Sequence, residues 1–358
     1  MENRKNFDFA EKAAVCAAAA DYLESGAKAD GISDRRFRVF HSAGARAQAN
    51  AVFMGFLRNF FPIKAAVEEF CKKPPRPALK AALFCACADL ATRKKAFQAV
   101  DSWVEFIKAK FSKGESGFAN AVLRKFPEFT GKIAEEAEKN PSAGNLSLAY
   151  SHPEWLVKKW ISEFGLETAL EILKNNRIPS DVFLRSSGSG AARSLEKKFE
   201  KSLRPSPFEN FKILAGGNWE AAEELLKSGE FYAQDPSTSL APALLNPRAG
   251  DSILDLCAAP GGKSRMCADL ALRSADFQKP ACSNSLLVSV DAPGPRMKKL
   301  EENLSKIDFL KSHSIASDLE SDGLVPELEK RGLPALFDGV LLDAPCSNTG
   351  VLRRRPDA

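Results

Sequence analysis

The amino-acid sequence predicts a multidomain protein with an all-α N-terminal domain, a small α+β middle region and a C-terminal α/β domain. Its 358 residues, 44% of them apolar, suffice for about two or three domains, each with its own core. Helical periodicity fills roughly the first 135 residues, whereas strand-like and helix-like segments alternate from about residue 236. We therefore expect domains at residues 1–140, 145–235 and 236–358.

Helical patterning defines the N-terminal domain. In residues 99–108, Val100, Trp103 and Ile107 fall on one helix face. Three prolines within residues 74–77 must interrupt the helices, because proline lacks the amide donor that a helix interior requires. The glycines of residues 114–117 predict a second break, followed by a short helix over residues 118–125.

The middle region opens with a helix that has Pro153 in its first turn, where the missing amide hydrogen costs nothing. Pro179 marks the end of this helix. A short strand over residues 182–185 and a helix over residues 219–227, closed by Gly229, follow. This mixture predicts a small α+β fold.

Strands and helices alternate in the C-terminal domain. Strands are predicted at residues 252–257, 286–291, 314–316 and 339–343, with helices over residues 263–273 and 296–304. Such alternation is typical of a doubly wound parallel sheet. The last strand is apolar enough for a central position, so we expect an open edge if no later strand covers it.

Composition limits the partners, bound metals and cellular compartment that we expect for this protein. Lysine and arginine exceed aspartate and glutamate by only 51 − 46 = 5, which permits a nucleic-acid partner without requiring one. No apolar run approaches the roughly 18 residues that a membrane span needs. Eight scattered cysteines without a C-x-x-C pair, and three distant histidines, predict reduced thiols and no metal site. We expect a cytoplasmic monomer that does not bind membranes.

Two glycines follow the first strand of the α/β domain, in the run D-L-C-A-A-P-G-G-K-S that starts at Asp255. A nucleotide-like ligand binds outside the carboxyl end of such a strand. The run lacks the spacing of a dinucleotide-binding turn, and Cys257 replaces the first glycine of a phosphate-binding P-loop.

Asp291 ends the second strand, where an acid can bind a ribose diol, and Asp318 follows the third strand. Either residue could instead be a solvated carboxylate.

A second polar run follows the fourth strand. It places Asp343 and Cys346 at the same edge of the sheet, with Pro345 fixing the backbone between them. The alternative for Cys346 is a buried structural thiol. Three adjacent cations, Arg353, Arg354 and Arg355, are suited to phosphate groups, although a solvated charged turn is the alternative.

These runs carry a resemblance to a known family. D-L-C-A-A-P-G-G-K-S and D-A-P-C-S-N-T-G-V-L-R-R-R-P-D resemble the first and fourth motifs of the Fmu/Sun family of S-adenosylmethionine-dependent RNA cytosine-5 methyltransferases. The segment S-H-P-E-W-L-V-K-K-W resembles the lead-in to that family's catalytic region. G-F-A-N-A-V-L-R-K is similar to the end of the NusB-like RNA-binding domain of bacterial ribosomal-RNA members.

The resemblance implies a Rossmann-like class I methyltransferase domain and assigns roles to its residues. Asp291 would bind the cofactor's ribose, Asp318 would lie by its adenine, and Asp343 would face both the cofactor and the target base. The arginine run would contact RNA, most directly ribosomal RNA. The methionine end of S-adenosylmethionine would lie on Cys257, Ala258, Ala259, Pro260, Gly261, Gly262 and Lys263.

The family's reaction is covalent: a thiolate adds to C6 of cytosine, C5 takes the methyl group, and the C5 proton leaves before the thiol departs. The attacking cysteine belongs to a Thr-Cys motif, whereas the cysteine matching Cys346 assists product release. No Thr-Cys pair occurs in this chain, which ends at Ala358. We therefore expect an incomplete methyltransferase domain, poor solubility and no methyl transfer by the chain as it stands.

Two alternatives stay open. The chain could be a non-catalytic RNA-binding protein with a degenerate methyltransferase domain, or Cys346 could itself be the nucleophile, as in DNA cytosine-5 methyltransferases.

The chain also departs from the family pattern at two places. Residues 274–285 are predicted to be an inserted loop, and the stiff turn after Asp291 could alter the ribose contact.

Overall fold

The computed structural model describes residues 8–71, 73–92, 96–216, 218–274 and 284–358, so most of the predicted inserted loop lies outside the described residues. Its contacts divide into one unit formed by residues 1–180 and 348–358, and another formed by residues 181–347. These boundaries differ from the three predicted domains, because the helix after Pro153 packs with the N-terminal helices. Within the described residues, none of the helices is long and apolar enough to cross a membrane.

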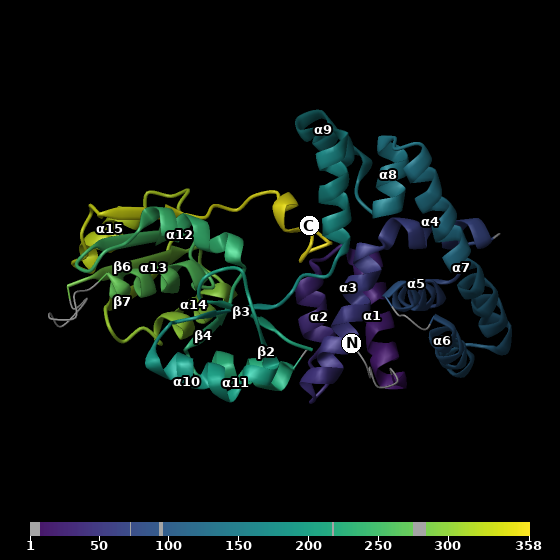
Figure 1. Cartoon of the computed structure of the whole chain (residues 1–358), viewed down its shortest axis with the longest axis horizontal. Helices are drawn as coiled ribbons and strands as arrows, with labels where there is room; N and C mark the ends of the chain where they lie inside the picture. Colours follow the sequence, from purple (N-terminus) through teal and green to yellow (C-terminus); the bar gives the residue numbers. More distant parts are fainter. Residues whose placement is uncertain (1–7, 72, 93–95, 217, 275–283) are drawn as a thin grey trace. The chain divides into compact units, whose positions relative to one another are not determined.

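The first unit, here called the helical unit, is all α (Figure 1). Buried aromatic side chains such as Phe53, Phe56 and Trp103 fill the core of its N-terminal part. A separate cluster around Trp160 joins its last helices to Leu352 of the C-terminal segment. Its elements are α1 (Phe9–Ser25), α2 (Ala29–Phe37), α3 (Ala43–Arg58), α4 (Phe60–Phe70), α5 (Pro77–Thr92), α6 (Ala96–Lys110), α7 (Lys113–Lys139), α8 (Ala143–Tyr150), α9 (Glu154–Arg177) and the 3-10 helix η3 (Thr349–Val351).

The helix α7 corrects one prediction. Its backbone is helical from residue 113, so the glycines of residues 114–117 do not break the chain. Ser112 caps the helix by accepting a hydrogen bond from the Glu115 amide, and burial of Val122 and Leu123 stabilises the helix further. Burial of this face outweighs the low helix propensity of glycine.

The second unit, here called the α/β unit, begins with an antiparallel sheet in the order β2-β3-β1-β4. Helices α10 and α11 bury Ala192, Ala222 and Leu225 with this sheet. The strand and helix predicted around residues 182–185 and 219–227 are confirmed. This part comprises β1 (Phe183–Ser186), α10 (Gly190–Lys198), the 3-10 helix η1 (Glu200–Ser202), β2 (Leu203–Pro205), β3 (Phe211–Leu214), α11 (Trp219–Lys227) and β4 (Phe231–Ala233).

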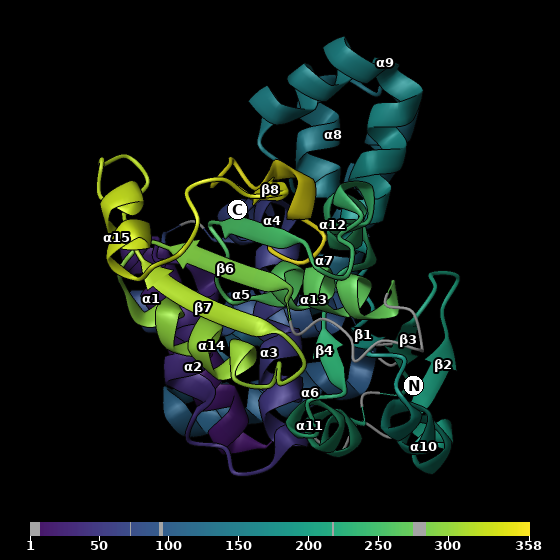
Figure 2. The ribbon, with the colours of Figure 1, turned by 90° about the vertical axis from the view of Figure 1, so that its left-hand side faces the viewer.

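A parallel sheet in the order β7-β6-β5-β8 completes the α/β unit, as the alternating pattern predicted (Figure 2). Leu300 of α14 belongs to the core on one face, and Leu328 of α15 to the core on the other. The elements are the 3-10 helix η2 (Pro236–Ser239), α12 (Leu240–Leu245), β5 (Ser252–Leu256), α13 (Gly262–Arg273), β6 (Leu286–Asp291), α14 (Pro295–Leu304), β7 (Lys311–Ala316), α15 (Leu324–Lys330) and β8 (Gly339–Leu342).

The strand β8 forms one edge of this sheet. Its side chains alternate, so that Leu341 is buried whereas Val340 and Leu342 are more than half exposed. The open apolar edge expected from the sequence is therefore present in the described sheet.

Candidate active site

The turn between β5 and α13 depends on two residues with left-handed backbone. Cys257 has φ 61° and Gly261 has φ 98°. A Cβ atom at Gly261 would lie 3.0 Å from Leu300 Cδ1 of α14. Glycine is therefore required at position 261 both for its conformation and for packing against α14.

Hydrogen bonds from β6 and α14 hold this turn. The Ala259 amide donates to Asp291 Oδ2 at 2.7 Å, and Asn303 Nδ2 donates to the Pro260 carbonyl at 2.7 Å. The Arg296 guanidinium donates to the Ala259 carbonyl. Sequence reasoning missed Arg296 and Asn303, for which the only available signal is their place in the helix that follows Asp291.

Asp255 is a fully buried acid next to the turn. Ser264 Oγ donates to its Oδ2 at 2.5 Å, while Oδ1 is buried without a hydrogen-bond partner. Burial raises the pKa of Asp255 to about 6, against the opposing effects of the Ser264 hydrogen bond and the Lys263 charge. This site thus has an unsatisfied acceptor and a carboxyl group that titrates not far below neutral pH.

Asp343 follows β8, and its amide continues the ladder by donating to the Leu256 carbonyl at 3.2 Å. The Lys263 ammonium at the start of α13 donates to the Asp343 carboxylate. Two residues predicted to belong to one site are therefore in direct contact, although they lie 80 positions apart in the sequence. The Asp343 side chain is half exposed, so it is accessible from solvent.

The acids of three strands act together on Cys257. Burial raises the pKa of its thiol most, and the charges of Asp291, Asp343 and Asp255 raise it further, whereas Arg296 lowers it. Hydrogen bonds place these carboxyl groups at the turn, near the carboxyl ends of β5, β6 and β8: Asp255 accepts from Ser264, Asp291 from the Ala259 amide and Asp343 from Lys263. Such a concentration of negative charge favours a cationic ligand group.

Asp318 and Cys346 lie in more exposed surroundings. The Asp318 carboxylate accepts a hydrogen bond from the Glu320 amide at 3.0 Å, within its own turn after β7. Cys346 is exposed in the irregular segment after β8, which excludes the buried structural thiol considered from the sequence. Among the described residues, no three His, Cys, Asp or Glu side chains form a group that could hold a metal ion.

The arginine run belongs to the helical unit. Arg353 Nε donates to the Ile178 carbonyl at 3.1 Å, and Arg355 pairs with Asp30 at 2.9 Å. Arg354 donates to Ser180 Oγ at 3.2 Å. These guanidinium groups are engaged with their own chain, and their contact with RNA phosphates stays a prediction.

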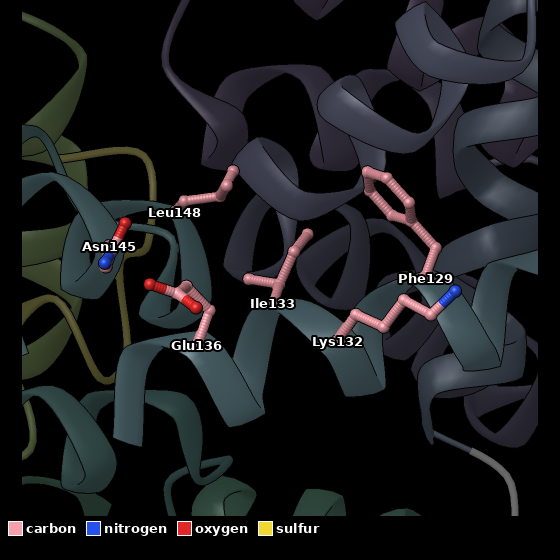
Figure 3. Close-up of a pocket in the computed structure, with 6 residues that line it drawn as sticks. All are labelled: Phe129, Lys132, Ile133, Glu136, Asn145 and Leu148. Carbon is pink, nitrogen blue, oxygen red and sulfur yellow. The ribbon is translucent and has the colours of Figure 1, made fainter. Parts of the chain in front are cut away.

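A shallow pocket of ≈ 210 Å³ opens between α7 and α8 of the helical unit (Figure 3). Phe129, Ile133 and Leu148 give it an apolar wall, and Lys132 and Glu136 extend beside it. None of the predicted site residues lines this pocket, so it is separate from the turn and its acids.

Comparison with known proteins connects this geometry to a family. Residues 242–358 match a family model described as 16S rRNA methyltransferase RsmB/F. The probable ribosomal RNA small subunit methyltransferase B of Bacillus subtilis is 32% identical over 72% of this chain and 55% of its own length. The ribosomal RNA small subunit methyltransferase B of Shewanella oneidensis is 27% identical over 97% of this chain and 76% of its own length.

A solved structure shares the fold. The crystal structure of PH0851 matches with a TM-score of 0.68 and 19% identity, over 97% of this chain and 77% of that chain. The present chain spans about half the length of the Bacillus relative.

Proposed function

We propose that this chain is a member of the Fmu/Sun family of RNA methyltransferases, that it binds S-adenosylmethionine, and that it takes part in the methylation of C5 of a cytosine in ribosomal RNA. The family model and the names of the relatives support RNA as the methyl acceptor. The observation that carries the proposal is that Asp255, Asp291 and Asp343 all accept hydrogen bonds from the turn that begins at Cys257 or from the first residues of α13.

The residues around the turn fit this cofactor. S-adenosylmethionine carries a sulfonium and an ammonium cation, which suit a site lined by carboxylates. One carboxylate oxygen of Asp291 accepts a hydrogen bond from the Ala259 amide, and its other oxygen can accept a hydrogen bond from a ribose hydroxyl. The unpartnered Oδ1 of Asp255 is a further acceptor beside the turn at Cys257–Lys263, and Asp318 would lie near the adenine.

The cofactor supplies a methyl group on a positive sulfur, and the protein's residues orient the base that receives it. Lys263 holds the Asp343 carboxylate at the carboxyl edge of the sheet, where it can accept hydrogen bonds from the target base. We assign Cys346 to product release, after a thiolate from another residue has added to C6 and the C5 proton has left. The family's Thr-Cys motif is absent from these 358 residues, so no residue of this chain is assigned as that nucleophile.

The helical unit would bind RNA as a NusB-like domain. The G-F-A-N-A-V-L-R-K run that supports this reading lies within α7. In this proposal the protein works in the cytoplasm, because its substrate is an RNA of the ribosome; a monomeric state stays a prediction.

Mapping of 5-methylcytosine in the host tests this function. Bisulfite sequencing of small-subunit ribosomal RNA, with and without the gene, should show one protected cytosine that loses protection when the gene is disrupted. Restoring the parent gene should restore protection, whereas Asp343→Ala should not. An unchanged set of protected cytosines would favour the non-catalytic RNA-binding alternative.

A further inference from the structure

A buried charge network joins the antiparallel sheet to α13 within the α/β unit. Arg185 of β1 donates through Nη1 to Asp269 Oδ2 at 2.5 Å and through Nε to Gln234 Oε1 at 2.7 Å. Arg265 Nε donates to the other oxygen of Asp269 at 2.8 Å. The side chains of Arg185, Asp269 and Arg265 are all at most 6% exposed.

This network is poorly suited to be a simple source of stability. Two guanidinium groups share one carboxylate, and both lie over the Tyr232 ring, at 5.6 and 5.2 Å from its centroid. Arg185 Nη2 is buried without a hydrogen-bond partner. Buried ion pairs are often no more stabilising than apolar residues of similar volume, whereas their geometry restricts how two elements can pack.

The helix held in this way is the one that begins at the turn. Its first residues include Lys263, which donates to Asp343, and Ser264, which donates to Asp255. Arg265, the next residue, also donates to the Lys306 carbonyl at 2.9 Å, just beyond α14. Since α14 holds the other side of the turn, the network connects to both helices that shape it.

We propose that Arg185 is a positioning residue for the cofactor turn. By fixing Asp269, and with it Arg265, Arg185 sets the rotation of α13 and hence the placement of Lys263 and Ser264. This inference rests on the proposed function for what the turn binds, but the effect on the turn itself does not require a ligand.

The test uses the whole chain and two readouts. Cys257 lies in the turn and is partly exposed, so its rate of alkylation by iodoacetamide, followed by mass spectrometry without ligand, reports on turn geometry. Alkylation of the exposed Cys346 provides an internal reference. Calorimetry with S-adenosylhomocysteine gives the affinity of the site.

In Arg185→Met, iodoacetamide should alkylate Cys257 several-fold faster than in the parent. The same variant should bind S-adenosylhomocysteine about tenfold or more weakly, because small displacements of positioning groups have large effects. Arg185→Lys, which keeps the charge but not the planar guanidinium, should give values of both readouts between those of Arg185→Met and the parent. The matched control is Arg204→Met, which removes an exposed ion pair with Asp181 from the same sheet. It should change neither readout.

Unchanged Cys257 alkylation and unchanged affinity in Arg185→Met, even with a lower melting temperature, would overturn the proposal in favour of a purely structural role. If Arg185→Met does not fold, Asp269→Asn, which preserves shape, decides by the same readouts. A parent chain that fails to bind S-adenosylhomocysteine would count against the proposed function, and the alkylation rates would still decide the role of Arg185.

Discussion

Asp255 shows how a single buried carboxyl group influences both the site and the stability of the protein. It lies near the end of β5 with one oxygen bonded to Ser264 and the other without a partner. The sequence identifies Asp255 only as the acid before a glycine-containing turn. Its burial depends on β6 and β8, whose pairing on either side of β5 is a tertiary feature.

The raised pKa of Asp255 predicts a pH-dependent stability. Its pKa is about 6 in the folded chain and near 3.8 when unfolded, so the folded state binds the extra proton between these values. Its contribution is therefore favourable at low pH and is lost as pH rises through 6, at a cost of up to about 3 kcal/mol. The unfolding free energy of Asp255→Asn relative to that of the parent, measured by urea unfolding, should therefore be greater at pH 8 than at pH 5.

The exposed Asp308 provides the control for this measurement. The difference in unfolding free energy between Asp308→Asn and the parent should be the same at both pH values. If the unfolding free energy of Asp255→Asn also has the same pH dependence as that of the parent, the Asp255 carboxyl group is not held in the buried state described here.

At the scale of elements, strand-end acids were predictable, but the contacts that position them were not. Asp291 and Asp343 follow apolar runs, so their place at the carboxyl edge can be read from pattern alone. The hydrogen bonds of Arg296 and the ion pair of Arg185 join residues far apart in sequence, and no local pattern indicates them. The break predicted at residues 114–117 was wrong because capping and burial outweigh glycine propensity in α7.

The C-terminal segment of residues 348–358 packs within the helical unit, which gives a second prediction. Leu352 is buried among α8 and α9, and Asp357 caps α2 by accepting from the Ala29 amide at 2.9 Å. Leu352→Ala should lower the unfolding free energy by about 2–5 kcal/mol, as for other buried leucines. Arg355→Ala should cost no more than about 1 kcal/mol, because its pair with Asp30 is partly exposed.

Urea unfolding followed by tryptophan fluorescence measures both values, since Trp160 lies in the same cluster as Leu352. The partly exposed neighbour Val351, changed to alanine, serves as the control and should have a small effect. A Leu352→Ala variant as stable as the parent would show that this segment is not packed on the helices in solution.

At the scale of the whole molecule, the net charge of +5 allows RNA binding through phosphate contacts. We expect the affinity for unmodified small-subunit ribosomal RNA to fall steeply as salt rises, in a filter-binding or fluorescence assay. Replacing Arg353, Arg354 and Arg355 by glutamine should flatten this dependence on salt, if the three guanidinium groups exchange their bonds within the helical unit for RNA phosphates.

A logarithmic salt slope reduced by about two or more in this triple variant would show that the arginines contact phosphates, as the sequence alone suggested. A parent affinity independent of salt would contradict phosphate binding altogether.

Calorimetric titration with S-adenosylhomocysteine tests most directly whether the turn after β5 is the S-adenosylmethionine site, as we propose. Gly261 and Gly250 both have left-handed backbone, with φ 98° and 97°, but only Gly261 lies in the turn, whereas Gly250 precedes β5 at the opposite end. The parent and Gly250→Val should bind, and Gly261→Val should show no detectable binding. Binding by Gly261→Val as tight as that of the parent would contradict a cofactor site at this turn.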